Sequence, residues 1–564
     1  MKFEEYTYTR PNMEEFSIKF HMALEQFSKA QSTEQQAKAM MRIEEIRNDL
    51  GTMFNLCYIR HSIDTNEEFY KDEQDYIDEI EPVVEGLVTE YYQELVNSKF
   101  RTELEKKWGK QLFDLAQAQL KTFSPAIVPL LQKENKLSSE YTKLIASAKI
   151  VFEGEERTLA QLEPFAESTD RTKRKLANEA RFGFFAENEE KFDDIYDQLV
   201  KVRTEIAKTL GYSNFVELAY YRMNRTDYDA SMVAKFRDQV KQYIVPVATK
   251  LKERQSERID VEALKYYDEP FNFKTGNAVP KGSPEWIIEN GQKMYNELSK
   301  ETGEFFQFMT EHHLMDLVAK KGKAGGGYCT FIENYRAPFI FSNFNGTSGD
   351  IDVLTHEAGH AFQVYSSRHF DISDYNWPTY EACEIHSMSM EFFTWPWMEL
   401  FFKEDTEKYK FAHLSGALLF LPYGVSVDEF QHWVYENPSA TPAERKRAWR
   451  DIENKYLPHK DYDGNEYLEN GGFWQRQAHI YNSPFYYIDY TLAQICAFQF
   501  WKRANENREE AWQDYVNLCR LGGSKSFTEL VKEANLISPF DDGCVQSVIG
   551  DIENWLNSVE DQKL

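Results

Sequence analysis

Glycine and proline are sparse in this chain, with 26 and 18 among 564 residues. Both residue types interrupt helices and supply turns, so their scarcity disfavours a protein built from many short strands and loops. The sequence therefore predicts a mainly helical fold. The chain is also too long for one simple core, and we expect two or more lobes.

Paired cysteines and long apolar runs are missing as well. The six cysteines are scattered and form no C-x-x-C pair, which argues against a disulfide framework and against a cysteine zinc site. No stretch approaches the roughly 18 apolar residues of a transmembrane helix. The N-terminal segment MKFEEYTYTRPNMEEF lacks the apolar core of a signal peptide. These absences predict a cytoplasmic protein without a membrane partner.

Basic residues are outnumbered by acidic ones, 65 to 93, which gives a formal net charge of −28. Such a surface is well solvated and repels phosphate backbones, so nucleic acid is not expected as a partner. Aromatic residues, in contrast, are abundant at 15% of the chain. They suit both the core of a large helical protein and the lining of a peptide-binding channel.

Helical periodicity covers most of the chain. In 64–98, apolar residues recur at spacings of three and four, and Pro82 is expected to kink this helix or to mark a junction. A short hairpin is predicted at 150–159, and loops are predicted at 269–286 and 457–473.

One further region favours strands. In 322–346 a glycine-rich turn precedes Tyr328 to Phe331, and apolar residues then recur at Phe339 and Phe341 before a stop at Asn345-Gly346. This region lies immediately before the most informative motif of the chain.

That motif is His356-Glu357-Ala358-Gly359-His360, which matches H-E-x-x-H. In a helix, positions i and i+4 lie on the same face, so both imidazoles can bind one zinc ion while Glu357 reaches a metal-bound water. The surrounding segment is largely apolar, and two histidines and a glutamate in a buried helix need a partner such as a metal. The motif predicts a catalytic zinc site with a third protein ligand and one open position.

The motif alone does not identify the third ligand. The extended zinc motif of the metzincins requires glycine at 363 and histidine at 366, but the chain has Gln363 and Ser366. A second buried helix is predicted to begin near Thr379. Within it, Glu384 and Glu381 are both candidates for the third ligand, because buried glutamates need a metal or a hydrogen-bond partner.

Acidic partners of the two histidines are also predicted. Metal-bound imidazoles usually donate their other ring nitrogen to an acid or a carbonyl. Glu391 lies seven residues after Glu384, on the same helix face, and Asp352 lies one turn before His356. Either acid is a candidate for this role, and either could instead be solvated or paired elsewhere.

Several segments together carry a resemblance to a known family. They are GGGYCTF at 325–331, PFIFSNFNGT at 338–347, THEAGHAF at 355–362, E-x-x-S at 384–387 and HIYNSPFYYIDYTLAQ at 479–494. With these segments the chain resembles the thimet-oligopeptidase-like zinc peptidases, and among them the oligoendopeptidase F and Pz-peptidase branch. The resemblance extends from about residue 190 to the C-terminus, and less specifically over the N-terminal helices.

The resemblance implies roles for individual residues. The expected ligands of one Zn²⁺ ion are His356, His360 and Glu384. The expected catalytic residues are the general base Glu357 and, from a C-terminal loop facing the zinc, His479, Tyr487 and Tyr490. Which tyrosine of this loop stabilises the oxyanion stays open. The expected substrate-binding residues are Gly326, Tyr328, Phe341, Asn343 and Tyr486.

The resemblance also implies a mainly α fold, in which a two-lobed helical clamshell encloses a deep central channel and a small β-sheet lies next to the zinc-binding helix. We expect residues 1–190 to form an N-terminal helical lobe and residues 191–564 to form the zinc peptidase catalytic domain. The strand at 337–345 is expected to present an exposed edge, which can pair with an extended peptide through main-chain hydrogen bonds.

The expected function is that of a zinc-dependent endopeptidase, which hydrolyses internal bonds of short, unfolded oligopeptides by a metal-activated water with a glutamate general base. Two alternatives stay open: an exopeptidase resembling the dipeptidyl carboxypeptidases, and a catalytically silent, zinc-containing peptide-binding protein. The expected partners are oligopeptide substrates, and the expected state is a monomer or a small homo-oligomer.

Overall fold

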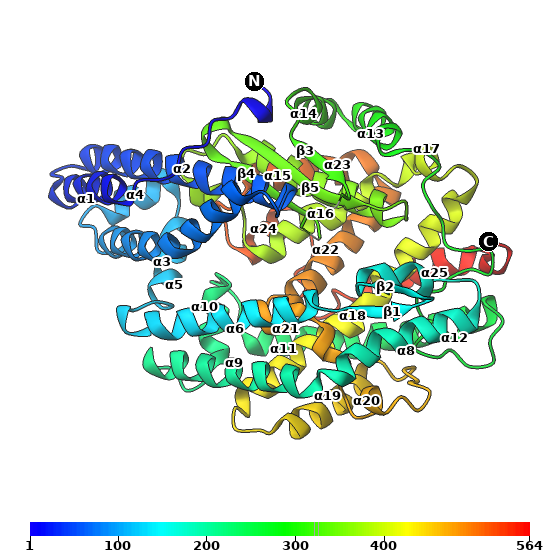
Figure 1. Ribbon diagram of the computed structural model, residues 1–564. Coiled ribbons are helices and arrows are strands. Elements are labelled where there is room, and N and C mark those ends of the chain that lie inside the picture. The colour runs from blue at the N-terminus through cyan, green and yellow to red at the C-terminus, as the bar shows by residue number, and fades with distance from the viewer. Residues whose placement is uncertain (321, 325) are drawn as a thin grey trace.

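Helices make up most of the structure, as the scarce glycine and proline predict (Figure 1). The structure is a computed structural model that describes residues 1–320, 322–324 and 326–564. The N-terminal helices are α1 (Met13–Lys29), α2 (Thr33–Ile63), α3 (Glu68–Val96), α4 (Arg101–Trp108) and α5 (Gln111–Leu120). The next are α6 (Val128–Ala146), α7 (Glu163–Ala166), α8 (Arg171–Glu187), α9 (Glu189–Thr209), α10 (Phe215–Arg222), α11 (Ala230–Gln239) and α12 (Val245–Arg258). Those that follow are α13 (Pro284–Leu298), α14 (Lys300–Glu311), α15 (Gly349–Ser367), α16 (Tyr380–Phe393), α17 (Glu399–Phe402), α18 (Thr406–Glu436) and α19 (Pro442–Tyr456). The last are α20 (Glu466–Glu469), α21 (Ala478–Asn482), α22 (Tyr487–Glu506), α23 (Arg508–Leu521), α24 (Phe527–Glu533) and α25 (Gln546–Ser558).

The helices form two halves, which confirms the two-lobed, mainly helical prediction (Figure 1). The upper half of the view holds α1 to α4 together with α15 and α16, and the lower half holds α6, α8, α9 and α19, while α22 runs between them. The chain therefore enters each half more than once. The predicted boundary at 190/191 falls in the first turn of α9, and the division into 1–190 and 191–564 remains a proposal.

Helix α3 shows how the apolar periodicity builds the N-terminal part. Its predicted inner positions Ile77, Ile80 and Leu87 are buried. The helix continues through Pro82, so this proline does not end it. Among the described residues, no helix combines the length and the apolar character needed to cross a bilayer.

The predicted hairpin at 150–159 is confirmed as the antiparallel pair β1 (Ile150–Phe152) and β2 (Glu155–Arg157). Its two turn residues, Glu153 and Gly154, have φ values of 52° and 82°. Positive φ at both central positions is the geometry of the tight turn whose twist matches that of the flanking strands.

The second sheet contains β3 (Met315–Val318), β4 (Tyr328–Ile332) and β5 (Ala337–Phe344) in the order β3-β5-β4. Strand β5 pairs in parallel with β3 and antiparallel with β4. The expectation that 337–345 presents an exposed edge is therefore wrong, because β5 has a neighbour on both sides. The edge strand that adjoins α15, the helix of the H-E-x-x-H motif, is β4.

Helices α15 and α16 approach each other closely at Gly359. A Cβ atom on Gly359 would lie 2.6 Å from both the backbone oxygen of His386 and the Cα of Ser387. Only glycine permits this contact, so Gly359, the fourth residue of the H-E-x-x-H motif, sets the distance between the two helices. α16 begins after Thr379, as predicted.

Candidate active site

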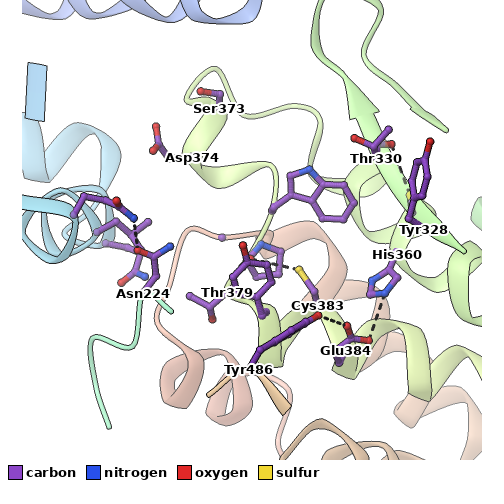
Figure 2. A pocket seen from close by; sticks show the side chains of 18 of the residues that line it. Asn224, Tyr328, Thr330, His360, Ser373, Asp374, Thr379, Cys383, Glu384 and Tyr486 are labelled. Carbon is purple, nitrogen blue, oxygen red and sulfur yellow. Dashed lines mark hydrogen bonds and ion pairs between the residues drawn. The ribbon is translucent and has the colours of Figure 1, made fainter. Parts of the chain in front are cut away.

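The two histidines of the motif and Glu384 form one cluster of potential metal ligands. Nε2 of His356 lies 3.2 Å from Oε2 of Glu384, and Nε2 of His360 lies 3.5 Å from the same oxygen. One ligand atom from each of the three residues lies within 4.8 Å of the others. Figure 2 shows Glu384 and His360 facing each other across the junction of α15 and α16. Three ligands of this kind fit a catalytic zinc site, in which the fourth position stays open.

The competing candidate Glu381 is turned away from this cluster. Its carboxylate accepts a hydrogen bond of 2.6 Å from the Thr379 hydroxyl, and its side chain is fully buried. Burial, together with the nearby charge of Asp489, raises the pKa of Glu381 to about 8. Asp489 is in turn paired with Arg225 at 2.8 Å. Glu384, rather than Glu381, is therefore placed to serve as the third ligand.

The second ring nitrogen of His356 has an acidic partner. Nδ1 of His356 lies 2.7 Å from Oε1 of Glu391, as predicted for one of the two candidate acids. The other candidate, Asp352, accepts a 2.6 Å hydrogen bond from the Tyr409 hydroxyl. Burial by itself lowers the pKa of His356. The hydrogen bonds to Glu384 and Glu391 outweigh this effect and hold the pKa well above its ordinary value. The cluster thus concentrates negative charge where a cation can neutralise it.

Glu357 lies beside the ligands without joining them. It is 7% exposed, and its Oε2 has no hydrogen-bond partner among the described residues. Burial raises the pKa of Glu357. A buried carboxylate oxygen without a hydrogen-bond partner lowers the stability of a protein and calls for an explanation. A role as a proton acceptor is such an explanation.

A cavity of about 700 Å³ opens onto this cluster (Figure 2). Edge strand β4 contributes Tyr328, Cys329 and Thr330 to its wall. Helices α3 and α5 of the N-terminal part form another wall, and Ser373 and Asp374 lie at the end far from His360 in Figure 2. The site is therefore bordered by segments that are distant in the sequence.

The C-terminal loop brings a histidine and tyrosines to the same place. The ring of His479 lies 5.7 Å from that of Tyr490 and 5.1 Å from that of Tyr487. Tyr490 lines the cavity at the metal ligands, whereas Tyr487 is buried and packs on Phe420. Of the two tyrosines predicted as catalytic, Tyr490 is the one that faces the ligands.

His479 is held in one orientation. The amide nitrogen of Gln477 lies 2.9 Å from Nδ1 of His479, and the amide oxygen of Gln477 accepts a 2.8 Å hydrogen bond from Tyr423. With Nδ1 as acceptor, Nε2 carries the proton. Burial lowers the pKa of His479 although Glu384 raises it, so the neutral imidazole presents an N–H donor at neutral pH.

The predicted substrate-binding residues separate into two groups. Tyr328 and Tyr486 line the cavity. Phe341 is fully buried behind Tyr328, with ring centroids 4.8 Å apart, and Asn343 donates hydrogen bonds to the backbone oxygens of Ala324 and Gly326. Phe341 and Asn343 thus support the strand and the glycine turn from behind. Gly325 of this turn lies outside the described residues.

Sequence reasoning missed several contacts of the site. The hydroxyl of Tyr486 donates to Oε1 of Glu384 at 2.9 Å, so this predicted substrate-binding residue also orients a candidate metal ligand. His413 binds Oε2 of Glu391 through Nε2 at 2.6 Å, and Trp395 donates to Nδ1 of His413 at 3.0 Å. These contacts join segments that are far apart in the chain, so no local spacing in the sequence predicts them.

Comparison with known proteins adds an independent line of argument. Two family models match the chain: the peptidase M3 N-terminal domain over residues 3–123 and peptidase family M3 over residues 165–548. A Borreliella burgdorferi protein described as an oligoendopeptidase F homolog is 25% identical over 422 residues, which are 70% of this chain and 69% of that protein.

Solved structures are similar over the full length. A structure of Pz peptidase A with an inhibitor has 73% sequence identity and a TM-score of 0.96, with complete coverage of both chains. A Bacillus anthracis protein assigned as an oligoendopeptidase F has 65% identity and a TM-score of 0.92, covering 100% of this chain and 99% of its own.

Proposed function

The chain belongs to peptidase family M3 and is a peptidase, and we propose that it is a zinc-dependent endopeptidase acting on short, unfolded oligopeptides. One observation carries this proposal above the others. His356, His360 and Glu384 gather their ligand atoms at the wall of a cavity, and the unpaired carboxylate of Glu357 lies next to them. A purely structural metal site needs neither the cavity nor the free carboxylate.

The proposed cofactor is one Zn²⁺ ion held by His356, His360 and Glu384. When bound, zinc supplies a Lewis acid for the scissile carbonyl and lowers the pKa of water at its open position toward roughly 7. Glu391 and Tyr486 keep His356 and Glu384 in the orientation that this binding requires.

Glu357 is proposed as the general base. Its Oε2 accepts a proton from the attacking water and later transfers that proton to the leaving amine. Its buried position helps both steps, because a raised pKa brings the carboxyl closer to the pH at which it must exchange the proton.

His479 and Tyr490 are proposed to stabilise the oxyanion. The Nε2–H of neutral His479 and the hydroxyl of Tyr490 are preorganised donors near the metal ligands. Removing one such donor typically costs about 10²–10³ in rate. Tyr487 is proposed to act indirectly, by packing against His479.

The substrate is proposed to bind as an added strand on β4. This strand is the last in its sheet, and Tyr328, Cys329 and Thr330 line the cavity. Main-chain pairing is largely blind to sequence, which suits an enzyme that accepts many peptides. Cytoplasmic location and a monomeric or small homo-oligomeric state remain predictions of the sequence.

The test uses an end-capped, internally quenched peptide of about ten residues, a length that an extended strand crossing such a cavity favours. We expect internal cleavage that a zinc chelator abolishes and added zinc restores. We expect Glu357→Gln to retain zinc but to lose at least about 10³ in kcat, since it removes the proposed base.

Each alternative predicts a different outcome. Cleavage of free-ended but not of capped peptides would indicate an exopeptidase. A zinc-loaded protein that binds peptides without cleaving any would indicate a silent binding protein. Equal turnover by the wild type and Glu357→Gln would contradict the role of Glu357.

A further inference from the structure

A second cavity, of about 490 Å³, adjoins the site at His356, one of the three candidate metal ligands. It shares two wall residues with the first cavity, namely His356 and Tyr490, and it also contains His479. His356 and Tyr490 thus stand between the two cavities, with Glu357 on the side of the first and His479 on the side of the second. Because His356 borders both cavities, a substrate residue held beside the candidate metal ligands can extend its side chain into the second cavity.

One wall of the second cavity is a face of α18 on which three of the four lining residues are glycine or alanine. Ala412, Gly416, Ala417 and Phe420 recur at helical spacing, and all four line the cavity. Gly416 lies in the middle of the helix, where glycine costs roughly 1 kcal/mol relative to alanine. A Cβ atom on Gly416 would meet nothing within 4 Å. The backbone therefore does not require glycine here, and its effect is to leave space in the cavity.

The opposite walls combine apolar side chains with one unpartnered amide. Met388 of α16 and Tyr487 of α22 line the cavity. Gln494, one turn beyond Tyr490 on the same face of α22, also lines it. Gln494 is only 6% exposed, and its Nε2 has no hydrogen-bond partner among the described residues. Such a group in a cavity wall points to a ligand that approaches it.

The two carboxylates of this cavity, Glu391 and Asp352, already have hydrogen-bond partners. Both oxygens of Glu391 are bound, by His356 and by His413, and Asp352 accepts a hydrogen bond from Tyr409. A ligand that enters the cavity therefore meets mainly apolar walls rather than an unpaired charge.

We propose that the second cavity binds a large apolar or aromatic side chain of the substrate residue next to the scissile bond, and that Gly416 sets the size this subsite accepts. The inference rests on the proposed peptidase mechanism and names the substrate class for that site. Gln494 offers a polar partner, so a tyrosine side chain is accepted together with phenylalanine, leucine and methionine.

The experiment fills the cavity from α18. End-capped peptides carry Gly, Ala, Leu, Phe or Tyr in turn at each position flanking the cleaved bond, and kcat/KM is measured for the wild type, Gly416→Ala and Gly416→Leu. For Gly416→Leu we expect losses of about 10- to 200-fold with Leu, Phe or Tyr at one flanking position, as side-chain pockets typically discriminate. Peptides with Gly or Ala at that position should change less than about threefold, and Gly416→Ala should fall between.

A control and a binding measurement separate the possible results. Gly183→Leu places the same side chain on α8, where a Cβ also meets nothing within 4 Å, and should leave every rate unchanged. In the Glu357→Gln background, binding of the same peptides is followed by calorimetry. Affinity for the Phe peptide should fall on adding Gly416→Leu, while affinity for the Gly peptide and the zinc content should not.

Two results would overturn the subsite. One is an equal loss for all peptides with Gly416→Leu, and the other is an unchanged profile. Failure of the wild type to cleave any peptide would instead contradict the proposed function itself, so the two failures can be told apart.

Discussion

At the scale of single residues, hydrogen bonds decide which nitrogen of each histidine can act. Trp395 has an indole N–H and can only donate, so Nδ1 of His413 accepts and its Nε2 carries the proton toward Glu391. Glu391 is then an acceptor on both oxygens, and it draws the proton of His356 to Nδ1. Nε2 of His356, which faces Glu384, is left free for a metal.

This series of hydrogen bonds predicts that His413 affects metal affinity, although His413 contacts none of the three candidate ligands. In His413→Phe, Oε2 of the largely buried Glu391 loses its donor, and we expect zinc affinity to fall by up to about tenfold, the lower end of the effect of such supporting partners. The measurement is the rate at which a chromogenic chelator removes zinc, together with the absorption spectrum of the cobalt-substituted protein.

The matched variant is His413→Gln, whose amide can donate to Glu391 and accept from Trp395. It should restore zinc retention toward that of the wild type. If His413→Phe and His413→Gln released zinc equally fast, the loss would come from packing rather than from the hydrogen bond. Unchanged release in both would show that Glu391 holds His356 without help.

At the scale of elements, the junction of α15 and α16 depends on Gly359. In Gly359→Ala the new methyl group meets backbone atoms of α16 at 2.6 Å, and backbone cannot rotate out of the way as a side chain can. We expect α16 to shift, at a cost of about 1–3 kcal/mol typical of overpacking. Because α16 carries Glu384, zinc affinity and kcat/KM should fall together.

The comparison variant is Gly183→Ala, at a helical glycine whose Cβ meets nothing within 4 Å. It should be neutral or stabilising by up to about 1 kcal/mol. Thermal unfolding with and without zinc gives the change in stability, and the chelator assay gives the change in zinc affinity. Wild-type zinc retention in Gly359→Ala would mean that the helices tolerate the methyl group, and the close contact would then have no role in placing Glu384.

Elements also show which features can be predicted from sequence. The helix of the H-E-x-x-H motif and the start of α16 follow from local signals, namely the i, i+4 spacing and the Thr379 cap position, and both helices are found as expected. The four residues of β3 carry no such signal, since they form a strand by pairing in parallel with β5. Strand order is likewise not local, and for this reason β5 was expected at an edge although it lies in the centre of the sheet.

The same distinction applies within the site. His356 and His360 can be predicted from their spacing alone, but periodicity leaves Glu381 and Glu384 equivalent as buried acids of one helix. Only the packing of α16 against α15 and α22 separates them, because it turns Glu381 toward Thr379 and Asp489. Similarly, no pattern in the sequence links Glu391 to His413 on α18.

At the scale of the whole molecule, the position of the site limits what can reach it. The ligands lie on a cavity bordered by N-terminal helices, the β4 edge, α16 and α22, which come from both ends of the chain. We therefore expect a substrate to enter as an extended segment. We expect that a folded domain does not present a loop to the candidate ligands, because the cavity walls would contact the elements that support the loop.

This geometry predicts selection by conformation rather than by sequence. We expect a susceptible sequence to be cut efficiently as a free peptide of about ten residues, and at least about 100-fold more slowly when the same sequence forms a loop of a stable folded domain, since exposing it requires local unfolding of that domain. The measurement is kcat/KM for the two substrates by mass spectrometry, with a destabilised variant of the carrier domain as control. Cleavage of the carrier should rise with its unfolded fraction, because only the unfolded chain fits between the walls.

Equal rates for peptide and folded loop would mean that the two halves of the molecule separate widely enough to admit a domain. In that case the walls described here would not define the substrate, and the size limit would have to be sought in the binding of the strand to β4.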